Sequence, residues 1–344
     1  MNDSMTENSK WWRLHHFPFA LFLITMLAVV LGGSIRIYDA GESCPDWPQC
    51  FGTWGFDISE EEQEAWWDAN PDEIDSRGED YRYTVWEIFL EWVHRFVTGI
   101  ILGPLCILQC YIAFKRRKEM PAVYRAANLA LILVIVQGIM GMITVMYDNV
   151  PWSVAAHLTL AMALAISLLW AWVRWMDAAN ALPEWMRLEK GSSSRILPRL
   201  YDLSLSTLAV LIFGAFVSSS SGQNLACNVG SFEAWPLCNG NLFITDAANL
   251  AYGHRIFVIV VGAWLVWNLR GMEASSIRKF LHAGFGFYLL NILLGAAYVL
   301  TWDDFERILS LLHLMFATFA FLCIGFAALL ARNAVFATSS GEEE

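Results

Sequence analysis

Four histidines lie inside apolar stretches of this 344-residue sequence, and imidazole is a common ligand of metals and haem. They form two pairs, His94 with His157 and His254 with His313, separated by 63 and 59 residues. At a helical rise of about 1.5 Å per residue, all four lie roughly 8–14 Å below the outer ends of their predicted helices. A single histidine at this depth would more simply be a core residue bonded to a neighbouring helix. Two matched pairs favour the axial ligands of two haems, because a buried ionisable group is costly without a function.

Charged residues accompany the histidines. Arg95 and Arg255 each directly follow a histidine, where a guanidinium could bind a haem propionate or extend to the outer interface. Glu91 lies one helical turn before the first histidine, where a carboxylate could move protons or stabilise developing positive charge. Glu87, one turn further out, either extends a proton path or is a solvated acid. Ala251 takes the place of Glu91 in the second half, so we expect the halves to differ in chemistry.

Four of the seven cysteines lie in two predicted outer loops. Cys44 and Cys50 have five residues between them, and Cys227 and Cys238 have ten. The outer compartment permits disulfides, so we predict one bridge in each loop. The bridges are either structural, or the first one cycles its redox state and passes electrons. The other three cysteines lie in predicted helices and are expected to be inert; they are Cys106, Cys110 and Cys323.

The composition indicates a membrane protein. Hydrophobic residues make up 57% and charged residues 16%, where soluble domains carry about 25% charge. This much apolar surface excludes disorder, and a net charge of −11 with no basic face argues against nucleic-acid binding. Eight stretches can each span a bilayer. They are residues 16–36, 85–114, 122–146, 152–174, 202–220, 249–269, 278–299 and 307–331.

The two halves of the chain resemble each other. WPQCFG (47–52) corresponds to WPLCNG (235–240), and both histidine pairs recur with the same neighbours, His-Arg and His-Leu. Four spans per half give both copies the same orientation, which is a parallel repeat. We therefore predict an all-α polytopic membrane protein whose eight transmembrane helices form two pseudo-symmetric four-helix bundles.

Basic residues cluster in the loops on one side, which predicts cytoplasmic termini. The N-terminal residues do not read as a signal or transit peptide, so a bacterial plasma membrane is the simplest location. The predicted segments are a cytoplasmic N-terminus (1–15), a first bundle (16–174) with outer loop 37–84, a cytoplasmic linker (175–201), a second bundle (202–331) with outer loop 221–248, and a cytoplasmic tail (332–344).

Several motifs together resemble haem A synthase over nearly all eight spans. They are GGSIRIYDAGESCPDWPQCFG (32–52), EWVHR (91–95), QGIMGMITV (137–145), AAHLTLA (155–161), GHR (253–255) and LLHL (311–314). The resemblance implies that the C8 methyl of haem O is oxidised to a formyl group by successive O2-dependent hydroxylations, giving haem A for cytochrome oxidase assembly.

The resemblance also implies roles for individual residues. His94 and His157 would hold the substrate haem O, His254 and His313 would hold a permanent haem b, and Glu91 would be the essential carboxylate. The cysteines at 44 and 50 match the family's loop pair. The expected partners are membrane lipid, an electron donor that the sequence does not identify, haem O synthase (protohaem farnesyltransferase) and oxidase assembly factors, and a homo-oligomer is an open alternative.

The sequence departs from the family pattern in its loops. Residues 57–82 are an acidic insertion, Ser218 replaces the repeat's Arg36, and the second cysteine spacing is longer. The main alternative function is a di-haem b-type electron carrier or quinol oxidoreductase that modifies no haem. A thiol oxidase would leave the four histidines unexplained, and a transporter is disfavoured because no pair of broken spans is evident.

Overall fold

The computed structural model describes residues 12–73, 76–78, 80–220, 226–227, 229–236, 238, 245–270, 276–301 and 305–336. Within these ranges the chain is helical and contains no β-strand. Eight helical spans are long and apolar enough to cross a membrane, which confirms the predicted class. They are α2 (Phe17–Ile37), the continuous α4 (Val85–Arg95), η2 (Phe96–Leu102) and α5 (Gly103–Lys115), then α6 (Pro121–Met146), α7 (Pro151–Ala178), α8 (Lys190–Ser219), α9 (Asp246–Leu269), α10 (Ser276–Leu300) and α11 (Glu306–Phe336).

The connection between the fourth and fifth spans is more helical than expected. The fifth helix begins at Lys190 rather than at residue 202, and the fourth ends at Ala178. The polar run KGSSSR suggested a loop, yet it forms the first turns of α8, which buries Leu197 and Leu200 against its neighbours. Only residues 179–189 separate the two helices, including the short turn η3 (Glu184–Met186).

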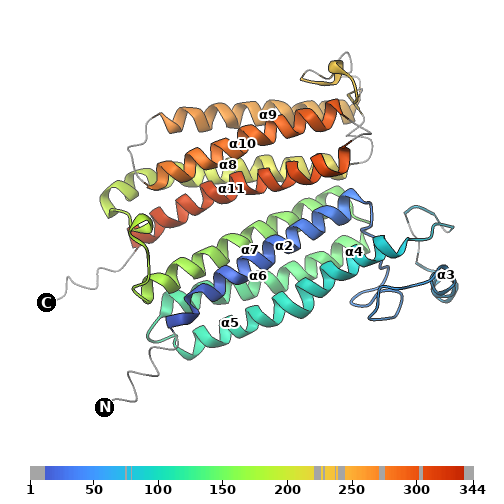
Figure 1. Ribbon diagram of the computed structural model, residues 1–344, viewed down its shortest axis with the longest axis horizontal. Coiled ribbons are helices and arrows are strands. Elements are labelled where there is room, and N and C mark those ends of the chain that lie inside the picture. The colour runs from blue at the N-terminus through green and yellow to red at the C-terminus, as the bar shows by residue number, and fades with distance from the viewer. Residues whose placement is uncertain are drawn as a thin grey trace.

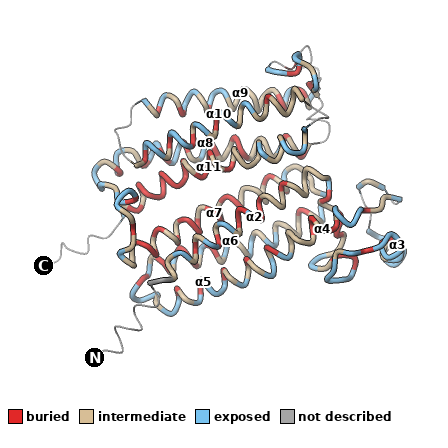
Figure 2. Tube along the Cα trace, viewed as in Figure 1, coloured by how far each residue is buried: buried red, intermediate tan, exposed pale blue. Residues whose placement is uncertain are grey.

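The helices form two groups, with α2 to α7 on one side and α8 to α11 on the other (Figure 1). Helix α7 contacts α8, and α11 contacts both α7 and α2, so these four helices form the junction. One apolar cluster crosses it, with Met26, Met162, Leu211 and Phe321 contributed by α2, α7, α8 and α11. Figure 2 shows the C-terminal halves of α11 and α7 as mostly buried, while few residues of α6 and α9 are buried. The pseudo-symmetric relation of the two groups stays a prediction.

The second span is not a uniform α-helix. Its middle segment, η2, is π-helical, and the amide of Gly103 donates to the carbonyl of Thr98, five residues earlier. The hydroxyl of Thr98 bonds the carbonyl of His94 at 2.8 Å. Pro104, which has no amide hydrogen, follows in the first turn of α5. Such π segments occur frequently at functional sites, and this one directly follows the His94–Arg95 pair.

Candidate functional site

Each of the four candidate histidines packs against a glycine on the preceding span. A methyl group added at any of these glycines would touch the imidazole Cε1 atom, in ordinary van der Waals contact at Gly32 and more closely at the other three. The separation of that methyl carbon from Cε1 would be 3.4 Å for Gly32 and His94, 3.1 Å for Gly141 and His157, 3.1 Å for Gly214 and His254, and 2.8 Å for Gly295 and His313. The same local arrangement therefore occurs four times, and each glycine supplies the space that a ring occupies.

The imidazole nitrogens fit haem ligation better than a multi-donor metal site. His157 and His254 each bury an Nδ1 atom that makes no hydrogen bond with the described residues. His94 has a backbone contact with Ala28, and Nε2 of His157 lies 3.3 Å from Nε2 of Gln137, which a ligand at that nitrogen would have to displace. In the fourth, Nδ1 of His313 lies 3.0 Å from the carbonyl oxygen of Asn291. A carbonyl only accepts, so Nδ1 carries the proton and Nε2 is left as the ligand atom. Among the described residues no group of three His, Cys, Asp or Glu side chains could hold a metal, whereas a haem needs only two axial ligands.

Glu91 is a buried carboxylate whose two oxygens are both hydrogen-bonded. It is 3% exposed, and its Oε1 lies 2.6 Å from Nη2 of Arg95. Its Oε2 accepts the amide of Cys44 at 2.9 Å and the hydroxyl of Ser43 at 3.1 Å. The candidate carboxylate is thereby attached to the first cysteine loop as well as to its own helix.

Arg95 and Arg255 each hold a cysteine-containing loop against a span. Both terminal nitrogens of Arg95 are engaged, by the carbonyls of Cys44, Asp46 and Gln49 at 2.5–2.7 Å and by Glu91. Arg255 donates from Nη1 to the carbonyls of Ala234 and Pro236, at 2.6 and 3.1 Å. Loop carbonyls therefore accept hydrogen bonds from N–H groups that were expected to bind haem propionates. At Arg95 both terminal nitrogens are engaged in this way or by Glu91, and at Arg255 the loop carbonyls engage Nη1.

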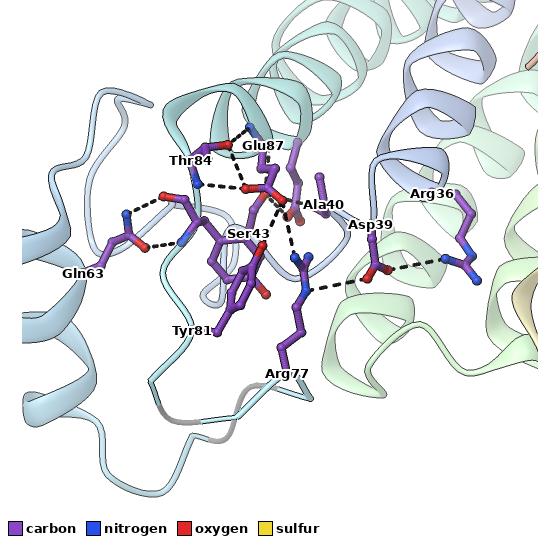
Figure 3. Close-up of polar contacts among 11 residues, drawn as sticks. Arg36, Asp39, Ala40, Ser43, Gln63, Arg77, Tyr81, Thr84 and Glu87 are labelled. Atoms are coloured by element: carbon purple, nitrogen blue, oxygen red, sulfur yellow. Dashed lines mark hydrogen bonds and ion pairs between the residues drawn. The ribbon is translucent and has the colours of Figure 1, made fainter. Parts of the chain in front are cut away.

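Glu87 has different partners from Glu91. It closes a capping box with Thr84 at the start of α4, and it accepts from Tyr81 at 3.2 Å and pairs with Arg77 at 3.4 Å (Figure 3). Burial raises the pKa of the Tyr81 phenol, which favours its protonated, donating form. Arg77 also pairs with Asp39 at 3.7 Å. The Glu87 carboxylate therefore starts the helix and anchors the loop.

The acidic insertion forms a cover over the first cysteine loop. It contains helix α3 (Glu60–Ala69), which begins in a capping box at Ser59. The fully buried Gln63 exchanges two hydrogen bonds of 2.9 Å with the backbone of Tyr83. Trp66 and Trp67 pack edge-on against Phe51, next to the buried cysteines. The insertion thus shields the loop from the outside.

Both predicted cysteine pairs are within bonding distance. Cys44 pairs with Cys50, and Cys227 pairs with Cys238. All four are buried, the first pair within the cluster that the insertion covers. The remaining cysteines are free thiols in helices; Cys106 and Cys110 are buried and Cys323 is partly exposed.

Sequence reasoning missed three contributors to this site. Gly141 and Gly295, which contact His157 and His313, were not recognised as part of the site. The sequence indicated them only by their position on the span that precedes each histidine. Ser43 was not singled out, although it lies beside Cys44 in the motif and bonds Glu91. Arg77 was not singled out either, although it is the single basic residue within the acidic stretch 37–80, and that isolation was the available signal.

Comparison with known proteins gives a consistent set of matches. The model of the COX15-CtaA family, described as cytochrome oxidase assembly protein, matches residues 15–324. The heme A synthase of Exiguobacterium sp. strain AT1b is 26% identical over 294 residues, covering 84% of each chain. That of Shewanella oneidensis is 30% identical over 233 residues, 65% of this chain and 62% of its own. That of Listeria welshimeri is 24% identical over 329 residues, 88% of this chain and 92% of its own.

Proposed function

Because the chain belongs to the COX15-CtaA family of cytochrome oxidase assembly proteins, we propose that it is a haem A synthase. Its substrate is haem O, and it oxidises the C8 methyl of the porphyrin to a formyl group through successive hydroxylations that use O2. Relatives bearing the name heme A synthase, matched along most of the chain, support this reading. The product serves cytochrome oxidase assembly.

The observation that carries the proposal is the difference between two otherwise similar halves. Each half has a histidine pair packed against glycines, but among the residues that the structure describes only the first half has a buried carboxylate one turn from a histidine. Ala251 stands at that place in α9. We assign the substrate haem to His94 and His157, and a resident haem b to His254 and His313. The resident haem supplies one-electron transfer when bound.

Glu91 is the proposed catalytic carboxylate. Two donors from the cysteine loop and one from Arg95 hold its oxygens in place, so its position relative to His94 is fixed before substrate binds. A carboxylate so placed can accept a proton, or stabilise positive charge, as the methyl group is oxidised. Arg95 acts as a positioning residue for both Glu91 and the loop.

Propionate binding by the two arginines remains part of the proposal. Arg255 retains Nη2 for this role, since its contacts with the described residues of the loop use Nη1. Arg95 would have to use its Nε–H, because loop carbonyls and Glu91 take its terminal nitrogens. We therefore propose that Arg255 is the stronger propionate partner.

The eight helices make this a multi-pass membrane protein. We propose a bacterial plasma membrane, cytoplasmic termini and an outward cysteine loop, supported by the basic residues of the connections at the opposite end. The division into a substrate half (16–174) and a haem b half (202–331) belongs to the same proposal.

The decisive test is pigment analysis. The full chain is expressed in membranes that receive a haem O supply and lack their own haem A synthase, and the extracted haems are separated. A formyl-haem peak that requires this chain is the expected result. Purified protein with two haems but no formyl product would favour the di-haem electron carrier and would contradict the proposal.

A further inference from the structure

An aromatic cavity lies between the two groups of helices, far from the polar network around Glu91. Its volume is about 420 Å³, and eight of its eleven lining residues are Phe or Trp. Phe19 of α2, Trp172 of α7, Phe287 of α10 and Phe319 of α11 contribute from four spans, and Trp185 reaches it from η3. Within the part of the chain that the structure describes, no charged side chain lines it. This aromatic pocket therefore suits a hydrocarbon chain and offers nothing to a carboxylate or a polar headgroup.

Along the spans that line it, the pocket is displaced from the level of the four histidines toward the opposite end of the molecule from the cysteine loops. On α2, Phe22 is ten residues from Gly32, which is roughly 15 Å along the helix. On α11, Phe319 and Phe326 are six and thirteen residues from His313, or roughly 9–20 Å. The pocket is thus one extended isoprenoid chain away from the histidine layer, on the cytoplasmic side.

We propose that the aromatic pocket binds the farnesyl chain of the haem substrate, an inference that rests on the proposed function. Haem O differs from protohaem by carrying this chain, so a site for it distinguishes the substrate from the haem that stays resident. Two of the helices that line it, α2 and α7, also position the substrate histidines through Gly32 and His157.

The pocket's expected preference for haem O over protohaem arises from shape and not from the hydrophobic effect. A farnesyl chain that leaves the bilayer exchanges one apolar surrounding for another, as helices do when they associate in lipid. Packing against fixed aromatic faces is what remains, so we expect a moderate preference, about tenfold between haem O and protohaem.

Cys323 provides a direct probe, because this free thiol lines the pocket. The full chain carrying Cys106→Ala and Cys110→Ala is reacted with N-ethylmaleimide, and labelling of Cys323 is followed by mass spectrometry. We expect haem O to slow the labelling at least fivefold and protohaem to leave it unchanged. Equal rates with both haems would overturn the proposal, as would equal protection by a prenylquinol or by added phospholipid alone.

A filled pocket gives the second test. Cys323→Trp should weaken haem O binding in spectral titrations about tenfold and leave protohaem binding unchanged, while Leu293→Trp on the exposed side of α10 should change neither. An intact resident haem spectrum shows that each variant is folded. Cys323→Trp that binds haem O as wild type would refute the pocket, even if haem A is still made. A wild-type protein that binds haem O but makes no haem A would refute the proposed function instead.

Discussion

Nη2 of Arg36 lies 3.0 Å from the carbonyl oxygen of Ser218, the residue that occupies the same position in the second half of the repeat. Arg36 also pairs with Asp39 at 3.5 Å, and Asp39 pairs with Arg77, which reaches Glu87 (Figure 3). A chain of charges therefore runs from the start of α4 to the end of α8. Because the second half has Ser218 where the first has Arg36, no second positive charge faces Arg36 at this contact. The backbone carbonyl of Ser218 accepts the hydrogen bond from Arg36 instead.

Glu91→Gln should lower haem A formation by about 10²-fold or more, the usual scale for losing a positioned acid–base group. The amide keeps the shape and part of the hydrogen bonding but loses the charge that faces Arg95. The resident haem spectrum should stay intact, and haem O or a hydroxylated intermediate should accumulate in the pigment extract.

Glu87→Gln, one turn outward on the same helix, is the matched control. Glutamine can also close the capping box with Thr84, so this variant removes only the charge that faces Arg77 and should keep most of the activity. If Glu91→Gln makes haem A at the wild-type rate, the catalytic assignment of Glu91 is wrong.

His254→Ala and His313→Ala should each abolish the low-spin b-type absorbance of the purified protein. Each variant removes one of the two axial ligands that we assign to the resident haem. His282→Ala should leave the spectrum unchanged, because this histidine is exposed and lies near the N-terminal end of α10. A full and unshifted haem complement in both ligand variants would contradict this assignment.

Gly295→Ala should reduce resident haem, because its methyl group would lie 2.8 Å from the ring of His313 and displace it. Gly286→Ala on the same helix meets open space and should retain full haem content. In α6, Gly141→Ala should impair only haem O binding, with Gly138→Ala as its control. Absorbance spectra with and without haem O separate the two effects, and identical spectra for Gly295→Ala and Gly286→Ala would disprove the packing argument.

The Cys44–Cys50 bridge should be intact in the resting protein. Both cysteines are buried, so alkylation has to follow unfolding in denaturant without reductant. Mass mapping should then find Cys106 labelled and Cys44 and Cys50 unlabelled until a reductant is added. Quantitative labelling of both before reduction would show that the bridge is absent.

The broad architecture was predictable because its signals are local or repeated. Hydrophobic runs indicated the eight spans, and the two cysteine pairs lay close enough in sequence to be joined. The family followed from short motifs that keep their order along the chain. The roles of Glu91 and the four histidines remain predictions.

The contacts of the site were less predictable, because they join distant residues through backbone atoms. Arg95 was expected to face a propionate, yet its partners include three loop carbonyls, which carry no side-chain signal. The polar start of α8 looked like a loop because local composition does not report the packing of Leu197 and Leu200. The covering role of α3 depends on tryptophans meeting Phe51, a contact that spacing alone does not indicate.

The π-helical segment of the second span changes how its faces should be assigned. A turn closed by an i to i+5 bond holds one residue more than an α turn, which rotates everything after it by roughly 100°. A helical wheel drawn continuously from Val85 to Lys115 would therefore assign lipid-facing and core-facing positions incorrectly beyond Leu102. Helix α9 has no such segment, so its register cannot be transferred to α5. Scanning mutagenesis of the second span needs two separate wheels, one on each side of η2.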